Sequence, residues 1–223
     1  MSGDGKSAVI RPEELVNHAI HLREEGEVSL AGEFYIAAAH SCISFRRRLP
    51  EERSPMMKED ANSPMYIAWG VQNILAASLC YRISGANSRA QRYCKIGMDI
   101  VEDVAAHEPQ FESTPARLGL ANEWFGDLRL FGKIEGYEEF YEEATAYYEQ
   151  TASPEGWNSE PEFDKTIMVL FALDGSIENP VVAESNLSPS YKSLVDRIRA
   201  KQKYYPEIIE KVVEQGTWES DYF

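Results

Sequence analysis

Residues 23–38, REEGEVSLAGEFYIAA, decide the fold. Gly26 ends a charged segment, and small or aromatic residues follow it at positions +5, +8, +9 and +12: Ala31, Phe34, Tyr35 and Ala38. Glycine readily adopts the left-handed conformation that ends a helix. The small residues let a second helix lie close to the first, and the aromatic pair fills the space between the helices. The stretch therefore predicts two helices joined by a turn at Gly26.

The same order occurs twice more, after Gly85 and after Gly132. The matching positions hold Ala90, Tyr93, Cys94 and Gly97 in one copy, and Tyr137, Phe140, Tyr141 and Ala144 in the other. Seven and four residues before the three glycines stand Ala19 and Leu22, Ser78 and Tyr81, and Phe125 and Leu128. Spacings of three and four residues give each helix one apolar stripe. A single hairpin cannot bury such stripes alone, so the three copies predict hairpins that stack.

This pattern resembles the tetratricopeptide repeat (TPR), a helix–turn–helix unit with small, aromatic and small residues at these offsets. The resemblance covers roughly residues 13–150 and concerns architecture rather than chemistry. The third copy departs from the family, because Phe125 and Tyr137 stand where small residues are preferred. The glycines are 59 and 47 residues apart, whereas the family period is about 34. The expected fold is all-α: a right-handed superhelix of stacked antiparallel helix hairpins, a TPR-like α-solenoid of about 8–10 helices.

The 223 residues are expected to form a single domain. Its parts are hairpin repeats at about 13–47, 64–105 and 116–150, with additional and capping helices in 161–223. Proline-containing linkers are expected at 49–64 and 107–115. Near the C-terminus one helix is expected to end at Tyr204, and another to run from Pro206 to Gln215, where Gly216 stops it.

The longest uncharged stretch runs from Ala61 to Tyr81. Gln72 and Asn73 lie in its centre, and amides are costly in hydrocarbon, so a helix buried by its neighbours is expected rather than a membrane span. The chain has three cysteines and no CxxC motif, and its start has no apolar signal-peptide region. A reducing, cytoplasmic location is therefore expected.

The formal net charge of −15 is unevenly distributed. Residues 1–101 hold 12 acids and 12 bases, whereas residues 102–164 hold 16 acids and 3 bases. Such an acidic segment repels phosphates, so nucleic acid is not an expected partner. Two interpretations stay open for the acidic belt 102–164: a solvated helix face, or a docking surface for a partner with basic groups.

An arginine stands three residues before each hairpin glycine: Arg23, Arg82 and Arg129. The resemblance implies that this position faces a concave groove, where three guanidinium groups could bind carboxylates or phosphates. The alternative is that each arginine stabilises the C-terminal end of its own helix. Our hypothesis is a partner-binding site for an acidic peptide. The Lys and Asn clamp of the family is missing, since its positions hold Val16, Ile20, Leu75, Ala76, Gly119 and Glu123.

The acidic and aromatic tail TWESDYF (217–223) has two interpretations: a disordered end, or a segment that docks on a groove of this chain or of a neighbour. Imidazoles are good metal ligands, and His18 and His21 stand three residues apart on one expected helix, with His40 on the next. However, the chain has no HExxH or ExxH motif, and no GxSxG, GxGxxG or P-loop. No catalytic residue, metal or cofactor is assigned.

The function that these patterns favour is a non-catalytic module for protein–protein interaction or scaffolding. It would bind a peptide or a partner protein through the concave groove and would not be an enzyme. The alternative is a helical metal-binding protein or enzyme with a site near His18, His21 and His40. Self-association into a homo-oligomer is left open.

Overall fold

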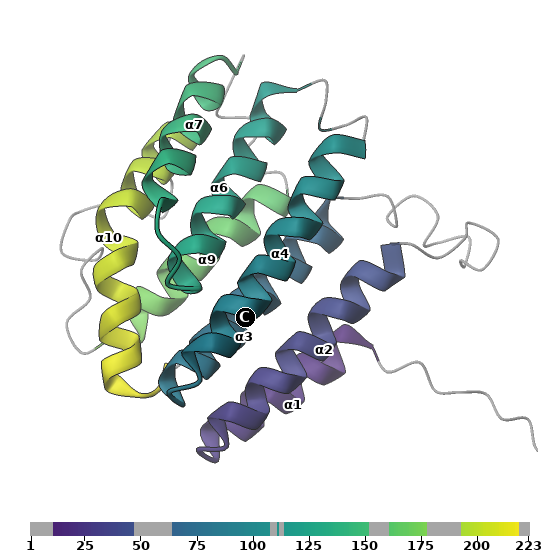
Figure 1. The fold of residues 1–223 in the computed structure, drawn as a ribbon, viewed down its shortest axis with the longest axis vertical. Coiled ribbons are helices and arrows are strands. Elements are labelled where there is room, and N and C mark those ends of the chain that lie inside the picture. Colours follow the sequence, from purple (N-terminus) through teal and green to yellow (C-terminus); the bar gives the residue numbers. More distant parts are fainter. Residues whose placement is uncertain are drawn as a thin grey trace, which may run out of the picture.

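The computed structural model describes residues 11–46, 64–107, 111, 114–151, 161–177 and 193–218. These residues form eight helices and no strand, which confirms the all-α prediction (Figure 1). The helices are α1 (Pro12–Glu24), α2 (Val28–Arg46), α3 (Met65–Ile83), α4 (Asn87–His107), α6 (Pro115–Phe131), α7 (Tyr137–Glu149), α9 (Pro161–Gly175) and α10 (Leu194–Gln215). Most of the two predicted linkers, 49–64 and 107–115, lies outside the described residues.

Three short turns join α1 to α2, α3 to α4 and α6 to α7. Gly26 and Gly85 adopt φ angles of +84° and +76°, so these two predicted left-handed glycines are confirmed. The prediction is wrong for Gly132, whose φ is −76°, because Lys133 takes the left-handed conformation with φ of +53°. The turn itself is the same, displaced by one residue: a backbone N–H bonds the carbonyl five residues earlier in each, as Ile134 does to Arg129.

Position 132 requires a small residue for a different reason. A Cβ atom at this position would lie 2.7 Å from the Cβ of Cys94 on α4, closer than side chains can approach. The glycine therefore allows the end of α6 to pack tightly against α4, while the next residue makes the turn.

The third hairpin also exchanges the roles of its two helices. Tyr141 and Tyr148 of α7 pack directly against Gly126 and Gly119 of α6, and a Cβ on either glycine would lie 2.4 Å from a ring carbon. The first helix, rather than the second, thus supplies the small residues. The two large residues that depart from the repeat pattern pack on other rings: Phe125 lies against Phe140, and Tyr137 lies against Tyr141.

The uncharged stretch forms α3, and nearly all of its side chains from Ile67 to Arg82 are buried. This helix packs against α2, α4, α6, α9 and α10, which confirms a helix buried by its neighbours. Its polar side chains bond to the preceding turn: Asn73 Nδ2 donates to Trp69 O at 2.8 Å, and Ser78 Oγ donates to Ile74 O at 2.8 Å. Within the described ranges, no helix has the length and apolarity needed to cross a membrane.

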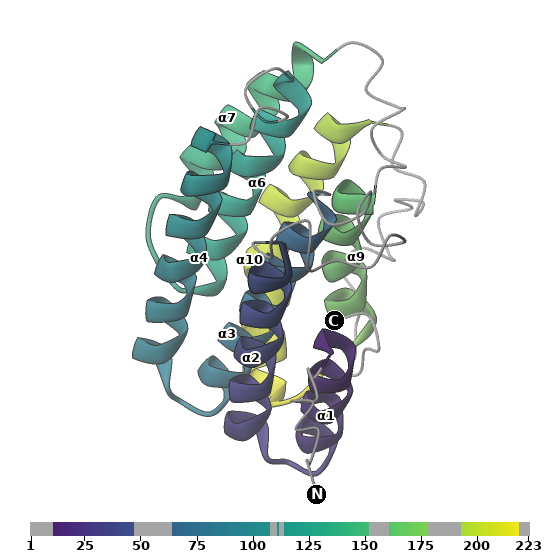
Figure 2. The same ribbon diagram turned by 90° about the vertical axis from the view of Figure 1, so that its right-hand side faces the viewer.

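The last two helices fold back onto the hairpins. α9 packs against α3, and α10 packs against α7, α9, α3 and α6. Figure 2 shows α4 and α7 on one side of the molecule, α1 and α9 on the other, and α10 between them.

The predicted break at Pro206 is wrong, because α10 is one continuous helix with Pro206 inside it. Tyr204, Tyr205 and Ile208 on both sides of the proline are buried, and this packing outweighs the lost hydrogen bond. Gly216 ends α10 with φ of +80°, as predicted.

Replacing Gly126 by Ala should lower the free energy of unfolding by about 1–3 kcal/mol, since the added methyl overlaps the Tyr141 ring. The matched control is Gly175→Ala, where a Cβ meets no atom within 4 Å and a change of at most about 0.5 kcal/mol is expected. Urea unfolding of both variants measures the difference. Equal losses in the two variants would contradict the close packing of α7 on α6.

Candidate functional site

Two of the three predicted arginines contact the C-terminal part of the same chain. Arg82, with its side chain 2% exposed, bonds through Nη2 to Glu210 Oε1 of α10 at 2.5 Å. The guanidinium carbon of Arg23 lies 4.4 Å from the ring centroid of Trp218, which is fully buried. Trp218 belongs to the tail TWESDYF, so the start of the tail docks on its own chain. Residues 219–223 lie outside the described residues.

Arg129 is placed differently. Its Nη1 donates to the carbonyl of Glu135 in the α6–α7 turn, and its guanidinium lies over the Phe140 ring at 4.8 Å. It stabilises the turn of its own hairpin, and its contacts do not join those of Arg23 and Arg82.

The three histidines are solvent-exposed. The His18 ring meets the Phe34 ring edge-on at 4.4 Å between centroids, and His21 lies near Glu24 and Glu25. In the part of the chain that the structure describes, no three His, Cys, Asp or Glu side chains are grouped so that they could hold a metal ion.

The structure reveals a buried charge network that sequence reasoning missed. Glu123 and Asp127 lie one turn apart on α6, and Arg197 and Lys201 lie one turn apart on α10. None of the four is more than 1% exposed. Arg197 Nη2 lies 2.5 Å from Glu123 Oε2, while Lys201 Nζ lies 2.8 Å from Glu123 Oε1 and 2.5 Å from Asp127 Oδ2. Two acids are thus matched by two bases.

The two tyrosines of α7 complete the buried charge network. Tyr148 donates its hydroxyl to Glu123 Oε2 at 2.5 Å, and Tyr141 donates to Asp127 Oδ1 at 2.8 Å. Arg197 Nη1 also donates to the Phe163 carbonyl of α9 at 3.0 Å. The network therefore connects α6, α7, α9 and α10.

The pKa values of the two buried acids are shifted in opposite directions. Burial alone would raise the pKa of Glu123, but the charges of Arg197 and Lys201 outweigh burial and lower it. Burial raises the pKa of Asp127 to about 6, because Lys201 only partly opposes burial and the charge of Glu123 adds to the rise. The difference arises because Glu123 contacts both cations, whereas Asp127 shares one with Glu123.

One sequence signal could have revealed the buried charge network. The acids recur at i, i+4 within an apolar stripe of α6 that also holds Leu120, Trp124 and Leu128. The bases recur at the same spacing on α10. The acidic belt 102–164 is consequently not uniform, since Glu123 and Asp127 are buried while the acids that follow on α7 are exposed: Glu138, Glu139, Glu142 and Glu143.

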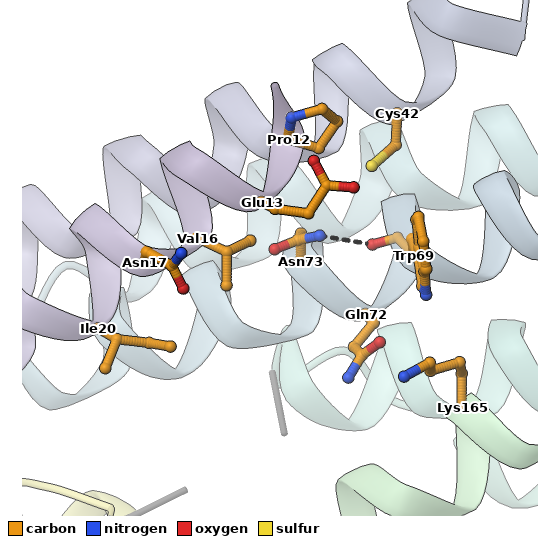
Figure 3. A pocket seen from close by; sticks show the side chains of 10 residues that line it. All are labelled: Pro12, Glu13, Val16, Asn17, Ile20, Cys42, Trp69, Gln72, Asn73 and Lys165. Atoms are coloured by element: carbon orange, nitrogen blue, oxygen red, sulfur yellow. Dashed lines mark hydrogen bonds between the residues drawn. The ribbon is translucent and has the colours of Figure 1, made fainter. Parts of the chain in front are cut away.

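A cleft of about 250 Å³ lies between α1 and α9 (Figure 3). One wall is the face of α1 from Pro12 to Ile20, the floor is Trp69, Gln72 and Asn73 of α3, and Lys165 of α9 faces them. Gln72 and Lys165 also border a gap of about 10 Å³ that reaches Asp127 of the buried charge network. That gap has roughly the size of one water molecule.

Asn73 is the unusual residue of the cleft. It is 6% exposed, and its Nδ2 donates to Trp69 O, which leaves Oδ1 as the remaining acceptor. This buried oxygen has no hydrogen-bond partner among the described residues. A buried acceptor without a donor costs about 1–3 kcal/mol. The cleft floor is thus prepared to accept an N–H or O–H group.

The cleft offers binding groups rather than an activated nucleophile. Burial raises the pKa of Cys42 at the cleft to about 12, and the nearby charge of Glu13 adds to the rise. The thiol is therefore neutral at physiological pH and chemically inert. Cys80 and Cys94 are also free and buried, and burial raises their pKa values to about 12.

No protein-family model, curated protein or solved structure matches this chain. The candidate site therefore rests on the geometry of the cleft.

Replacing Trp218 by Ala should lower the free energy of unfolding by about 3–5 kcal/mol, because a fully buried ring on Arg23 is lost. Leu30→Ala is the control, since Leu30 is 45% exposed and its loss should change stability by at most about 0.5 kcal/mol. Thermal and urea unfolding report both. A Trp218→Ala variant as stable as the wild type would contradict a docked tail.

Asp127 should also make stability depend on pH. Its pKa rises from 3.8 to about 6 on folding, so the folded state holds this proton more tightly, and the stabilisation is lost as pH rises through that interval. Asp127→Asn lacks this titration. The stability of the wild type relative to this variant should therefore fall by about 2 kcal/mol between about pH 4 and 7. A difference that stays constant or rises over that range would show that Asp127 is ionised throughout.

Proposed function

We propose that the protein is a non-catalytic interaction module that binds a short extended segment of a partner protein in the cleft between α1 and α9. In this proposal the three hairpins form a TPR-like array, a right-handed superhelix whose inner side is partly filled by α9 and α10. The shared turn geometry at Gly26, Gly85 and Lys133 supports a repeated unit. The cleft is the part of that inner side that stays open.

The observation that carries this proposal is the buried acceptor of Asn73. Main-chain N–H groups are regularly spaced donors, and an extended peptide presents them together with side chains on alternate sides. Asn73 Oδ1 would accept one such N–H, and Gln72 beside it adds a second amide to the floor. Val16 and Ile20 on α1 provide an apolar wall for a side chain.

The contacts of Arg23 and Arg82, which were predicted to line a concave site, support a structural role for these arginines within the chain. Arg82 and Arg23 contact Glu210 and Trp218, which are themselves an acidic and an aromatic residue of the C-terminal region. A partner at these arginines would have to displace α10 or the tail. We therefore place the external ligand in the cleft.

Asn73→Leu tests the proposal. The wild-type full-length chain is used to select binders from a random peptide library, and their affinities are measured by fluorescence anisotropy. Loss of the acceptor should weaken the selected peptides about tenfold, roughly the value of one hydrogen bond. The variant should unfold at the same or a higher temperature than the wild type, because an unsatisfied buried group has been removed.

The matched control is Leu30→Ala on the exposed side of α2, which should leave these affinities unchanged. Peptides that bind Asn73→Leu as tightly as the wild type would show that they bind elsewhere, and the proposed function of the cleft would be wrong.

A further inference from the structure

The two walls of the cleft carry opposite charges. Figure 3 shows Glu13 on the α1 wall and Lys165 on the α9 wall, with Gln72 and Asn73 between them. The charge of Glu13 reaches Cys42 on the same side, where it helps to raise the pKa of the thiol. Among the described residues, Glu13 has no ion-pair partner within 4 Å, and Lys165 is the one cation that lines the cleft.

The α1 side of the cleft collects acceptors. The Asn73 oxygen is buried and lacks a donor, and the Glu13 carboxylate stands on the wall that faces it. A neutral donor would bond to Asn73 alone, while the exposed Glu13 carboxylate would stay with water. A cationic donor satisfies both, because hydrogen bonds to charged groups are the stronger ones. This end of the cleft therefore fits an ammonium or guanidinium group.

The volume of the cleft and its apolar surface further restrict which ligands fit. About 250 Å³ lies just below the range of about 300–1,000 Å³ that is usual for pockets of drug-sized ligands. That volume suits one long side chain rather than a helix. Val16 and Ile20 offer apolar surface for an aliphatic stem, and Trp69 adds an indole ring to the lining of the cleft.

We propose that the cleft binds a Lys or Arg side chain of the partner segment, with its charged head at Asn73 and Glu13. This inference rests on the proposed function, since it names the chemistry of the peptide that the cleft takes. Lys165 on the α9 wall and Gln72 on the floor would donate to acceptors of the segment, either its carbonyl oxygens or a neighbouring acidic side chain. The net charge of −15 draws cationic segments toward the protein at a distance.

The experiment uses the peptides selected on the full-length chain whose affinity falls in Asn73→Leu. Each of these peptides should contain Lys or Arg. Norleucine keeps the aliphatic stem but removes the charge, so replacing that residue by norleucine should weaken binding to the wild type at least tenfold. On Glu13→Gln the same replacement should weaken binding no more than about threefold. The control Glu142→Gln removes one exposed charge from α7 and should behave as the wild type.

Several results would overturn the cationic preference while the peptide-binding role stands. Cleft-binding peptides without Lys or Arg would do so, and so would norleucine peptides of unchanged affinity. Equal effects of Glu13→Gln and Glu142→Gln would show that general charge, and not the cleft, attracts the peptide.

A second measurement does not depend on the library. Nα-acetyl-lysine methylamide is titrated into the full-length chain, and the side-chain amide signals of Asn73 are followed by NMR, with the norleucine analogue as control. The lysine probe should shift the Asn73 signals and the norleucine probe should not. Spermidine is titrated as a third probe. Shifts of the Asn73 signals with spermidine but not with the lysine probe would assign the site to free polyamines, and the inference that the cation belongs to a peptide would be wrong. No Asn73 shift with any probe would also overturn the inference.

Discussion

The buried charge network of Glu123, Asp127, Arg197 and Lys201 is the constraint on which the rest of the structure depends. Removing four charges from water costs several kcal/mol for each ion unless every one is paired and hydrogen-bonded. An apolar seam would let α10 slide along α6 at little cost. Here a displacement by one turn would leave a charge unpaired in the core. The network therefore determines the register of α10 more than it adds stability.

The position of α10 in turn determines what lies around the cleft. Glu210, two turns beyond Lys201, reaches Arg82 of α3, and the segment after Gly216 brings Trp218 to Arg23 of α1. α9 is held from both sides: Arg197 bonds the Phe163 carbonyl, and Trp124 Nε1 donates to Thr166 Oγ1 at 3.2 Å. These contacts flank Lys165 and place it at the cleft. The network thus adds to the packing of α9 on α3 and of Trp218 on Arg23 in positioning Lys165 and the tail.

Local patterns in the sequence predicted most of the hairpin architecture, because helix ends and apolar stripes depend on neighbours in the chain. Gly26 and Gly85 were recognisable as turns for this reason. Gly132 was misinterpreted, since its role is to approach Cys94 of another helix, and such a role has no local signature. Pro206 was misinterpreted for a related reason: the packing of Tyr205 and Ile208 outweighs a local preference.

The candidate site was harder to predict than the fold. Arg23 and Arg82 were singled out by their register, but their contacts come from α10 and the tail, which lie more than a hundred residues away. Glu123 and Lys201 are 78 residues apart, and their pairing depends on how the last helix folds back. The cleft combines α1, α3 and α9, so its lining could not be assembled before the packing of α9 was known.

The contrast between the two groups of buried polar residues shows which one is directed at a ligand. Tyr141, Tyr148 and the four charges contact one another, so each charge of the network has an ionic partner within the protein, although Arg197 Nε has no hydrogen-bond partner among the described residues. Asn73 uses its N–H group within α3 but leaves its oxygen without a donor among the described residues. A leucine, which has the same branched shape, would avoid the cost of an unsatisfied acceptor at this buried position. A donor from outside the described residues would satisfy the Asn73 oxygen, and the cleft is the route by which such a donor can arrive.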